Sequence, residues 1–295
     1  MNLCNPTELK ALLNRHGFNF SKTLGQNFLI DKNVLNKIVS ASELNENSCV
    51  LEIGPGAGTL TRRLAETGAR CTAVEIDKAL LPILGETLAG FDNFNLINSD
   101  ILKVDLKKLT KDEFDNKPFH VIANLPYYIT TPIIMQILES RLPVVSMTLM
   151  VQKEVADRMC ATCGSKEYGA LSVAVQYYTI PTVICRAEPH CFIPQPKVAS
   201  SVVHLKVSAT PTVTVSDEKK FFAFFTSFPS LIILKTKFLF VCFCFMLFVS
   251  FLLVFLGIPK VFLLNPIIIY AYCNVNKLSF RVLNRVMNKK FTLPK

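Results

Sequence analysis

The sequence predicts an α/β fold, in which a doubly wound domain is built around a mostly parallel sheet. Short runs that are almost wholly apolar alternate along the chain with segments of helical periodicity, which is typical of parallel strands covered on both faces. A glycine-rich loop follows the first of these runs. Polar side chains stand where several runs end, and open α/β sheets bind ligands at that edge.

The expected elements follow one another in a regular order. A helix over residues 31–41 begins at the capping residue Asp31, and its apolar side chains recur at helical spacing. The five strands expected next, with helices between them, are residues 48–54, 70–77, 94–100, 119–125 and 144–152. Two later apolar runs, over residues 171–179 and 200–207, supply further strands that close the sheet at one edge.

Charge is distributed unevenly along the 295 residues, whose net charge is +10. Residues 1–207 carry 21 Lys and Arg against 20 Asp and Glu, whereas residues 208–295 carry 11 against 2. The charge balance of the first 207 residues therefore gives no support by itself to nucleic-acid binding. Nearly all of the excess positive charge lies in the final 88 residues.

The N-terminus and the cysteines favour a reduced, cytoplasmic protein. Polar and charged residues occupy the start of the chain, where a signal peptide needs an apolar stretch. We therefore expect the ten cysteines to be thiols. Cys160 and Cys163 have the spacing of half a zinc site, but no second close pair completes the pattern, so we expect no metal.

The glycine-rich loop predicts a cofactor that contains adenosine. Gly54, Gly56 and Gly58 follow the first strand, and glycine lets a backbone turn tightly beside a ligand. Glu75 ends the next strand, where its carboxylate could bind two ribose hydroxyls. The G-x-G-x-G spacing differs from the G-x-G-x-x-G of nicotinamide cofactors, and the loop has no basic residue before Arg62. We favour S-adenosylmethionine over a nicotinamide dinucleotide and over a turn without a ligand.

Two more polar residues end strands at the same edge. Asp100 could accept a hydrogen bond from an adenine amino group, and Asn124 ends the following strand. The Asn124 side-chain carbonyl and a backbone carbonyl at Leu125 or Pro126 could accept both hydrogens of an exocyclic amino group, which makes its nitrogen a better nucleophile. Pro126 would hold the turn, and Tyr127 could stack on the base for about 1–3 kcal/mol. The alternative is an Asn-Pro turn with two packed tyrosines.

Seven motifs in sequence order carry a resemblance to a known family. They are GQNFLID (25–31), EIGPGAGTLT (52–61), EIDK (75–78), NSDIL (98–102), NLPYYITTPI (124–133), YGALSVAVQYY (168–178) and FIPQPKVASSVV (192–203). Together they resemble the adenine dimethyltransferases of small-subunit ribosomal RNA, the KsgA type, over about residues 8–207. GQNFL and YGALSVAVQYY favour this type over the methyltransferases of large-subunit ribosomal RNA, which share the cofactor motifs.

The resemblance implies a Rossmann-like, S-adenosylmethionine-dependent methyltransferase domain. Such an enzyme dimethylates N6 of two adjacent adenosines near the 3′ end of small-subunit ribosomal RNA within an assembly particle. Phe192 would face the base opposite Tyr127, which completes an aromatic clamp. The catalytic residues implied are Asn124, Leu125, Pro126, Tyr127 and Phe192. The cofactor-binding residues implied are Asn27 and Leu29, which would close over the cofactor, and Gly54, Gly56, Glu75, Ile76, Asp100, Ile101 and Asn124.

The C-terminal part departs from the family after Phe225. We expect an N-terminal helix and cofactor-closing segment in residues 1–30 and the methyltransferase domain in 31–207. An atypical tail in 208–295 would replace a small basic RNA-binding domain. The 21 uncharged residues from Phe238 to Ile258 are long enough to span a bilayer. Fifteen of the 23 phenylalanines lie in the final 88 residues, however, which favours A/T-rich DNA read in a wrong frame or through non-coding sequence over a membrane anchor.

Other classes of function stay open from the sequence. A non-catalytic ribosome assembly factor with the same fold would bind the cofactor without turnover. A membrane-tethered protein would need detergent for extraction, and a nicotinamide dehydrogenase would fail to bind S-adenosylmethionine. The intact Asn-Leu-Pro-Tyr-Tyr motif and glycine loop favour the enzyme.

Overall fold

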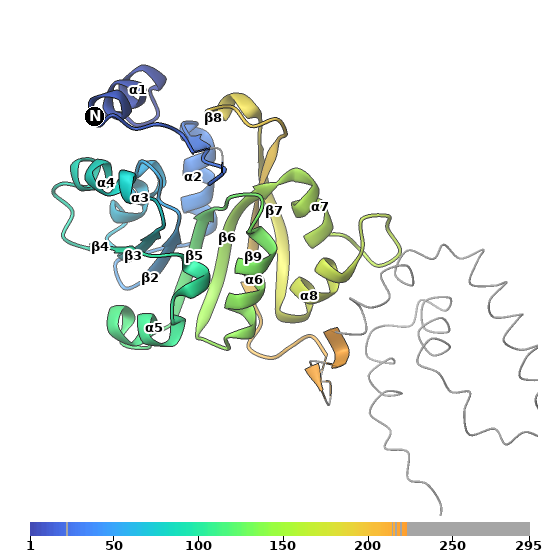
Figure 1. Cartoon of the computed structure of the whole chain (residues 1–295). Helices are drawn as coiled ribbons and strands as arrows, with labels where there is room; N and C mark the ends of the chain where they lie inside the picture. Colours follow the sequence, from blue (N-terminus) through green and yellow to red (C-terminus); the bar gives the residue numbers. More distant parts are fainter. Residues whose placement is uncertain (22, 214, 216, 219, 223–295) are drawn as a thin grey trace, which may run out of the picture. The chain divides into compact units, whose positions relative to one another are not determined.

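The computed structural model describes residues 1–222 apart from residues 22, 214, 216 and 219. Its contacts divide the chain into two compact units, one of residues 1–160 with 178–209 and one of 161–177 with 210–295. Figure 1 shows the sheet and helices of the first unit. The domain boundaries expected after residues 30 and 207 stay predictions.

The first unit is built on one seven-stranded sheet, with the order β4-β3-β2-β5-β6-β9-β7 (Figure 1). The strands from β4 to β6 in this order pair in parallel, and β9 runs antiparallel between β6 and β7. Because the chain runs outward from β2 in both directions, the predicted doubly wound arrangement is confirmed. The strands are β2 (Cys49–Ile53), β3 (Arg70–Glu75), β4 (Phe94–Asn98), β5 (Phe119–Asn124), β6 (Val144–Gln152), β7 (Thr179–Ala187) and β9 (Ser200–Val207).

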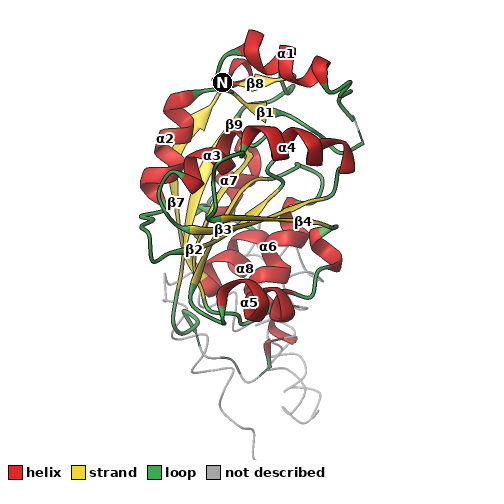
Figure 2. Cartoon of the chain, turned by 90° about the vertical axis from the view of Figure 1, so that its left-hand side faces the viewer, coloured by secondary structure: helices red, strands yellow, loops and turns green. Residues whose placement is uncertain are grey.

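Helices cover both faces of this sheet. Figure 2 shows α2, α3 and α4 on one side and α5 and α6 on the other. Asp31 caps α2 as expected, because its carboxylate accepts hydrogen bonds from the backbone N–H groups of Asn33 and Val34. The helices of the first unit are α1 (Pro6–Arg15), α2 (Lys32–Ala41), α3 (Thr59–Ala65), α4 (Leu81–Thr87), α5 (Leu106–Phe114), α6 (Thr130–Glu139) and α7 (Lys153–Met159), with single 3₁₀ turns η1 (Lys78–Leu80), η2 (Ile101–Lys103) and η3 (Pro189–Cys191).

The hydrophobic core holds the central strands, whose carboxyl ends form the edge where the ligand is expected. Leu35 of α2 and Leu64 of α3 pack in one buried cluster with Val50 of β2 and Ile122 of β5. All four side chains are fully buried. Burial of one such side chain stabilises the fold by about 1.5–3 kcal/mol. The ends of β2 and β5 are therefore rigidly placed.

A short two-stranded ribbon joins the N-terminal part to a distant segment. Residues Phe28–Leu29 (β1) pair antiparallel with Phe192–Ile193 (β8), in the register Phe28 with Ile193 and Leu29 with Phe192. Successive strand residues point to opposite faces. Accordingly, Phe28 and Ile193 pack in the cluster formed by α1 and α4, whereas Leu29 and Phe192 pack in the cluster beneath α2.

The predicted strand over residues 171–179 is wrong, because residues Ala170–Tyr178 form the helix α8. Apart from its tyrosines, α8 has only Ser172 and Gln176 as polar residues, and their spacing of four fits one face of a helix as well as one face of a strand. The strand β7, which follows directly, was not among the predicted strands, and it contains Pro181. Proline is tolerated there because β7 lies at the edge of the sheet, outside β9.

The described part of the second unit is small and partly aromatic. The ring of Tyr177 packs against Phe221 and Phe222, with centroid separations of 5.4 and 5.3 Å. Its hydroxyl donates a hydrogen bond to Glu218, and its backbone carbonyl accepts one from Thr212. These contacts attach Thr212, Glu218, Phe221 and Phe222 to the end of α8.

Among the residues that the structure describes, no helix combines the length and the hydrophobicity needed to cross a membrane. The apolar run from Phe238 to Ile258 and the hypothesis about the tail lie outside the described residues. The described part also holds no group of three or more metal-binding side chains.

Candidate functional site

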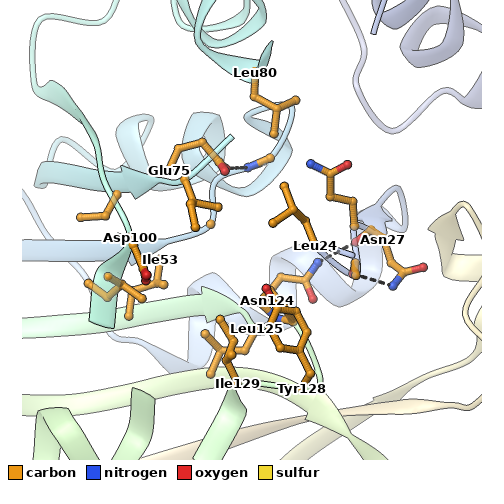
Figure 3. A pocket seen from close by; sticks show the side chains of 18 of the residues that line it. Leu24, Asn27, Ile53, Glu75, Leu80, Asp100, Asn124, Leu125, Tyr128 and Ile129 are labelled. Carbon is orange, nitrogen blue, oxygen red and sulfur yellow. Dashed lines mark hydrogen bonds between the residues drawn. The ribbon is translucent and has the colours of Figure 1, made fainter. Parts of the chain in front are cut away.

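A pocket opens at the carboxyl ends of β2, β3, β4 and β5, where the strand order reverses (Figure 3). Open α/β sheets bind ligands at this switch point. Figure 3 shows Glu75, Asp100 and Asn124 reaching the pocket from separate strand ends. The structure brings eleven of the predicted site residues to its lining, namely Asn27, Gly54, Gly56, Glu75, Ile76, Asp100, Ile101, Asn124, Leu125, Pro126 and Tyr127.

The glycine loop folds tightly around the end of β3. Gly54 and Gly56 have φ values of +70° and +61°, a region that glycine adopts without strain. The Gly54 N–H donates to the Val74 carbonyl at 3.0 Å. A Cβ atom on Gly56 would lie 3.0 Å from the ring of Phe28, so the loop has no room for a side chain there.

Glu75 is a buried hydrogen-bond acceptor at the pocket wall. Its Oε2 accepts the Gly56 N–H at 3.2 Å and its Oε1 accepts the Asp77 N–H at 2.8 Å. Burial raises the pKa of Glu75, and these backbone hydrogen bonds act in the opposite direction. A carboxylate has about four lone-pair sites, so Glu75 can still accept hydrogen bonds from ligand hydroxyls.

The neighbouring wall combines apolar surface with one more carboxylate. Ile76 and Leu102 line the pocket with 48% and 39% of their surface exposed, so both offer apolar contact to a ligand. Asp100 begins the turn η2 by accepting the Leu102 N–H at 3.0 Å. Lys103 lies 3.9 Å from the Asp100 carboxylate and is itself largely exposed. Asp100 keeps lone pairs for a donor in the pocket.

Residues 24–29, called the N-terminal segment below, cover the opposite side of the pocket. The Gln26 side chain donates to the Asp77 carboxylate at 2.6 Å, and the Asn27 side chain donates to the Gly25 carbonyl at 3.0 Å. The Asn124 Nδ2 donates to the backbone carbonyl of Asn27 at 2.9 Å (Figure 3). A flipped Asn124 amide would place two oxygens against each other. The Asn124 carbonyl oxygen is thus the atom left for a ligand.

The loop after Asn124 has a defined backbone. The Leu125 N–H donates to the Met150 carbonyl at 3.1 Å. The Pro126 carbonyl accepts both the Ile129 N–H at 3.2 Å and the Thr130 hydroxyl at 3.1 Å. Because a carbonyl oxygen has two lone pairs, the Pro126 carbonyl is fully occupied. Of the two backbone carbonyls predicted to accept a substrate hydrogen, that of Pro126 is therefore already used, and that of Leu125 is the remaining candidate.

Two predicted site residues, Leu29 and Phe192, do not line the pocket. Both are buried, with Phe192 only 1% exposed, in the cluster beneath α2. The cause is the alternation of side chains along the ribbon, which turns Phe28 toward Gly56 and Leu29 away from it. In this arrangement the predicted clamp between Phe192 and Tyr127 is not formed.

Sequence reasoning missed several lining residues. The motif GQNFL contains four lining residues, of which Asn27 was predicted and Gly25, Gln26 and Phe28 were missed. Alternation along a strand would place Asn27 and Leu29 on one face, so it gave no signal for Phe28. Tyr128 also lines the pocket, is exposed, and lies beside Gly25. The full set of lining residues not predicted is Leu24, Gly25, Gln26, Phe28, Ile53, Val74, Leu80, Ser99, Leu102, Tyr128 and Ile129.

Glu52, in the middle of the sheet, is 1% exposed, and its Oε2 has no hydrogen-bond partner. Burial raises the pKa of Glu52 to about 8, the neighbouring Thr61 hydroxyl opposes the increase, and the charge of Glu75 adds to it. A carboxyl group whose pKa is higher in the folded state than in the unfolded state favours folding only while it is protonated. Its contribution is fully present below the unfolded pKa near 4.5 and is lost as the pH rises through about 8.

Glu52→Gln is therefore expected to gain stability relative to the parent chain as the pH rises from 5 to 9. The expected difference grows by up to about 1.4 kcal/mol per pH unit between pH 5 and 8, levels off above that range, and totals a few kcal/mol. Thermal or urea unfolding at each pH measures it, with the exposed Glu46→Gln as the control. Parallel pH profiles for the parent and Glu52→Gln would contradict the prediction.

The chain is similar in sequence to one protein family and to several of its members. A family model described as "Ribosomal RNA adenine dimethylase" matches residues 17–243, and so continues past Phe225 into residues outside the described part. The "Ribosomal RNA small subunit methyltransferase A" of Alkaliphilus oremlandii (strain OhILAs) is 52% identical over 221 residues, which are 75% of this chain and 77% of that protein.

Two solved structures are similar to the described fold. The 23S rRNA methyltransferase ErmE matches with a TM-score of 0.56 and 29% identity, over 70% of this chain and 77% of that one. A dimethyladenosine transferase from Plasmodium falciparum matches with a TM-score of 0.54 and 28% identity, over 61% of this chain and 63% of that one.

Proposed function

The chain belongs to the ribosomal RNA adenine dimethylase family, and on that premise we propose that it dimethylates N6 of two adjacent adenosines near the 3′ end of small-subunit ribosomal RNA. The methyl donor is S-adenosylmethionine. The enzyme acts on a ribosomal assembly particle in the cytoplasm. Residues 31–207 contain its methyltransferase domain.

The lining of the pocket supports this cofactor. It contains two carboxylates, Glu75 and Asp100, and no Lys or Arg among the described residues. Such a lining suits ribose hydroxyls and an adenine amino group and is unsuited to a diphosphate. Ile76 and Leu102 provide apolar contact for the adenine ring. When bound, S-adenosylmethionine supplies an electrophilic methyl group on a sulfonium.

The arrangement around Asn124 is the observation that carries the proposal. Its Nδ2 is held by the Asn27 carbonyl, so its Oδ1 can accept one hydrogen of the substrate amino group. The Leu125 carbonyl accepts the second hydrogen. Together they draw the nitrogen lone pair out of conjugation with the purine ring as N6 attacks. The methylated nitrogen then releases a proton to water, so positioning supplies most of the acceleration.

Tyr127 is the proposed stacking surface for the target base. Its ring is half-buried and lines the pocket directly after the Asn124 turn. A flipped base held between this ring and the two acceptors would present N6 toward the cofactor side of the pocket. Phe192 stays a predicted second stacking partner, and it would have to leave its core cluster to reach the base.

The test is transfer of labelled methyl groups to small ribosomal subunits that lack these methylations. We expect incorporation at the two adjacent adenosines. Tyr127→Ala should reduce it by about 10- to 100-fold, because loss of one base stack costs about 1–3 kcal/mol. Cofactor binding by the parent chain without incorporation into either ribosomal subunit would contradict catalysis and favour a non-catalytic assembly factor.

A second candidate substrate is large-subunit ribosomal RNA, which the similarity to the ErmE structure brings into consideration. The same assay with large subunits distinguishes the two. Incorporation into large subunits alone would overturn the proposed substrate and leave the proposed chemistry intact.

A further inference from the structure

Tyr127 is tied to a strand that takes no part in the pocket lining. The Tyr127 hydroxyl and the Ser200 Oγ are hydrogen-bonded at 2.8 Å, although the two residues are 73 positions apart in the sequence. Ser200 is fully buried and does not line the pocket. The hydrogen bond therefore links Tyr127, where the target base is expected, to β9, a strand that lies beyond β6 and outside the pocket lining.

Ser200 is a rigid anchor. It begins β9 and is paired with Gln152 of β6 on one side and with Ala187 of β7 on the other. The preceding residue, Ala199, accepts a hydrogen bond from the Lys153 N–H at 3.0 Å. Strands on both sides thus hold the Ser200 hydroxyl in one place.

The Tyr127 ring depends on such an anchor. Backbone hydrogen bonds fix the turn at Pro126 but leave the ring free to rotate about its side-chain torsions. Burial raises the pKa of Tyr127, and the hydrogen bond to Ser200 opposes that increase. A half-buried hydroxyl without a partner is unfavourable, so the phenol oxygen is held at Ser200 and the ring axis points in one direction.

We propose that Ser200 is a positioning residue for methyl transfer, which fixes the place of the Tyr127 ring against which the target base stacks. The inference rests on the proposed function, because it assigns Ser200 a role only through the base-stacking role of Tyr127. Ser200 does not contact the cofactor pocket, so it should affect use of the RNA and not affinity for S-adenosylmethionine.

The test compares three variants of the full chain with the parent. Ser200→Ala removes the anchor, and Tyr127→Phe removes the same hydrogen bond from the other side while keeping the ring. Ser201→Ala is the matched control, because Ser201 is equally buried, adjacent in β9, and directed to the opposite face. Each is measured for kcat/KM with small subunits, for cofactor affinity, and for thermal stability.

Ser200→Ala and Tyr127→Phe are each expected to lower kcat/KM roughly 3- to 10-fold, the effect of one neutral hydrogen bond. Cofactor affinity should stay unchanged, and the double variant should be no worse than either single one. Ser201→Ala should keep the parental kcat/KM whatever its effect on the melting temperature.

Parental kcat/KM in Ser200→Ala, or losses that multiply in the double variant, would overturn the inference while leaving the proposed function standing. If Ser200→Ala does not fold, Tyr127→Phe decides the question alone, since a parental kcat/KM in that variant overturns the inference. A parent chain that transfers no methyl group to either ribosomal subunit would overturn the proposed function, and with it the role of Ser200.

Discussion

Asn124→Ala is expected to lower kcat for methyl transfer by about 10²- to 10³-fold, the range found when one preorganised polar group is removed from an active site. The variant loses the carbonyl oxygen that accepts a substrate hydrogen, and it also loses the bond that joins Asn124 to the Asn27 carbonyl. Because Glu75 and Asp100 are unchanged, affinity for S-adenosylmethionine should fall only a few-fold. Single-turnover rates and titration calorimetry measure the two effects separately.

Asn124→Asp tests the orientation assigned to the Asn124 amide. The side chain keeps its shape, but an oxygen replaces the Nδ2 that now lies 2.9 Å from the Asn27 carbonyl. Repulsion between the two oxygens should displace the side chain, so this variant is also expected to lose most of its kcat. Asn95→Ala, on the exposed part of β4, serves as the control. Parental kcat in Asn124→Asp would contradict the orientation assigned to the amide.

Gly56→Val is expected to weaken binding of S-adenosylmethionine by at least about 100-fold. A β-branched residue at a φ of +61° is strongly disfavoured, at a cost of roughly 1–2 kcal/mol for the left-handed region alone. Its Cβ would also lie 3.0 Å from the Phe28 ring and push against the N-terminal segment. Titration calorimetry measures the affinity, and circular dichroism checks that the fold is retained.

Substitutions at two other glycines distinguish the effect of backbone strain from that of a steric clash. Gly90 has a φ of +95° and no neighbouring atom within 4 Å of an added Cβ, and it lies outside the pocket lining. Gly90→Val should lose stability and keep cofactor affinity. Gly54, at +70°, also has no atom within 4 Å, so Gly54→Ala tests backbone strain at the pocket without the Phe28 contact. Unchanged affinity in Gly56→Val would show that the loop is not a ligand site.

The sequence was sufficient to predict which residues reach the edge of the sheet. Glu75, Asp100 and Asn124 each stand at the end of an apolar run, and parallel strands bring such ends together. This inference needs only local pattern and the fold class. It does not require knowledge of any contact between distant residues.

Side-chain direction in the short ribbon could not be predicted in the same way. Leu29 and Phe192 belong to two-residue strands, and their orientation is set by pairing with each other across more than half of the described chain. The bonds from Gln26 to Asp77 and from Tyr127 to Ser200 span 51 and 73 residues and have no local signature. For α8 the reason is different, because its two polar residues are four positions apart, and that spacing is compatible with a helix and with a strand.

The pairing of β1 with β8 also determines when the site can be completed during protein synthesis. Phe28 and Leu29 leave the ribosome early, but their partners Phe192 and Ile193 follow only after all the strands that carry the pocket. A nascent chain that ends before Phe192 has every strand end around the pocket but lacks the strand that holds the N-terminal segment in register. The cover of the pocket is thus among the first parts to be translated and among the last to be fixed in place.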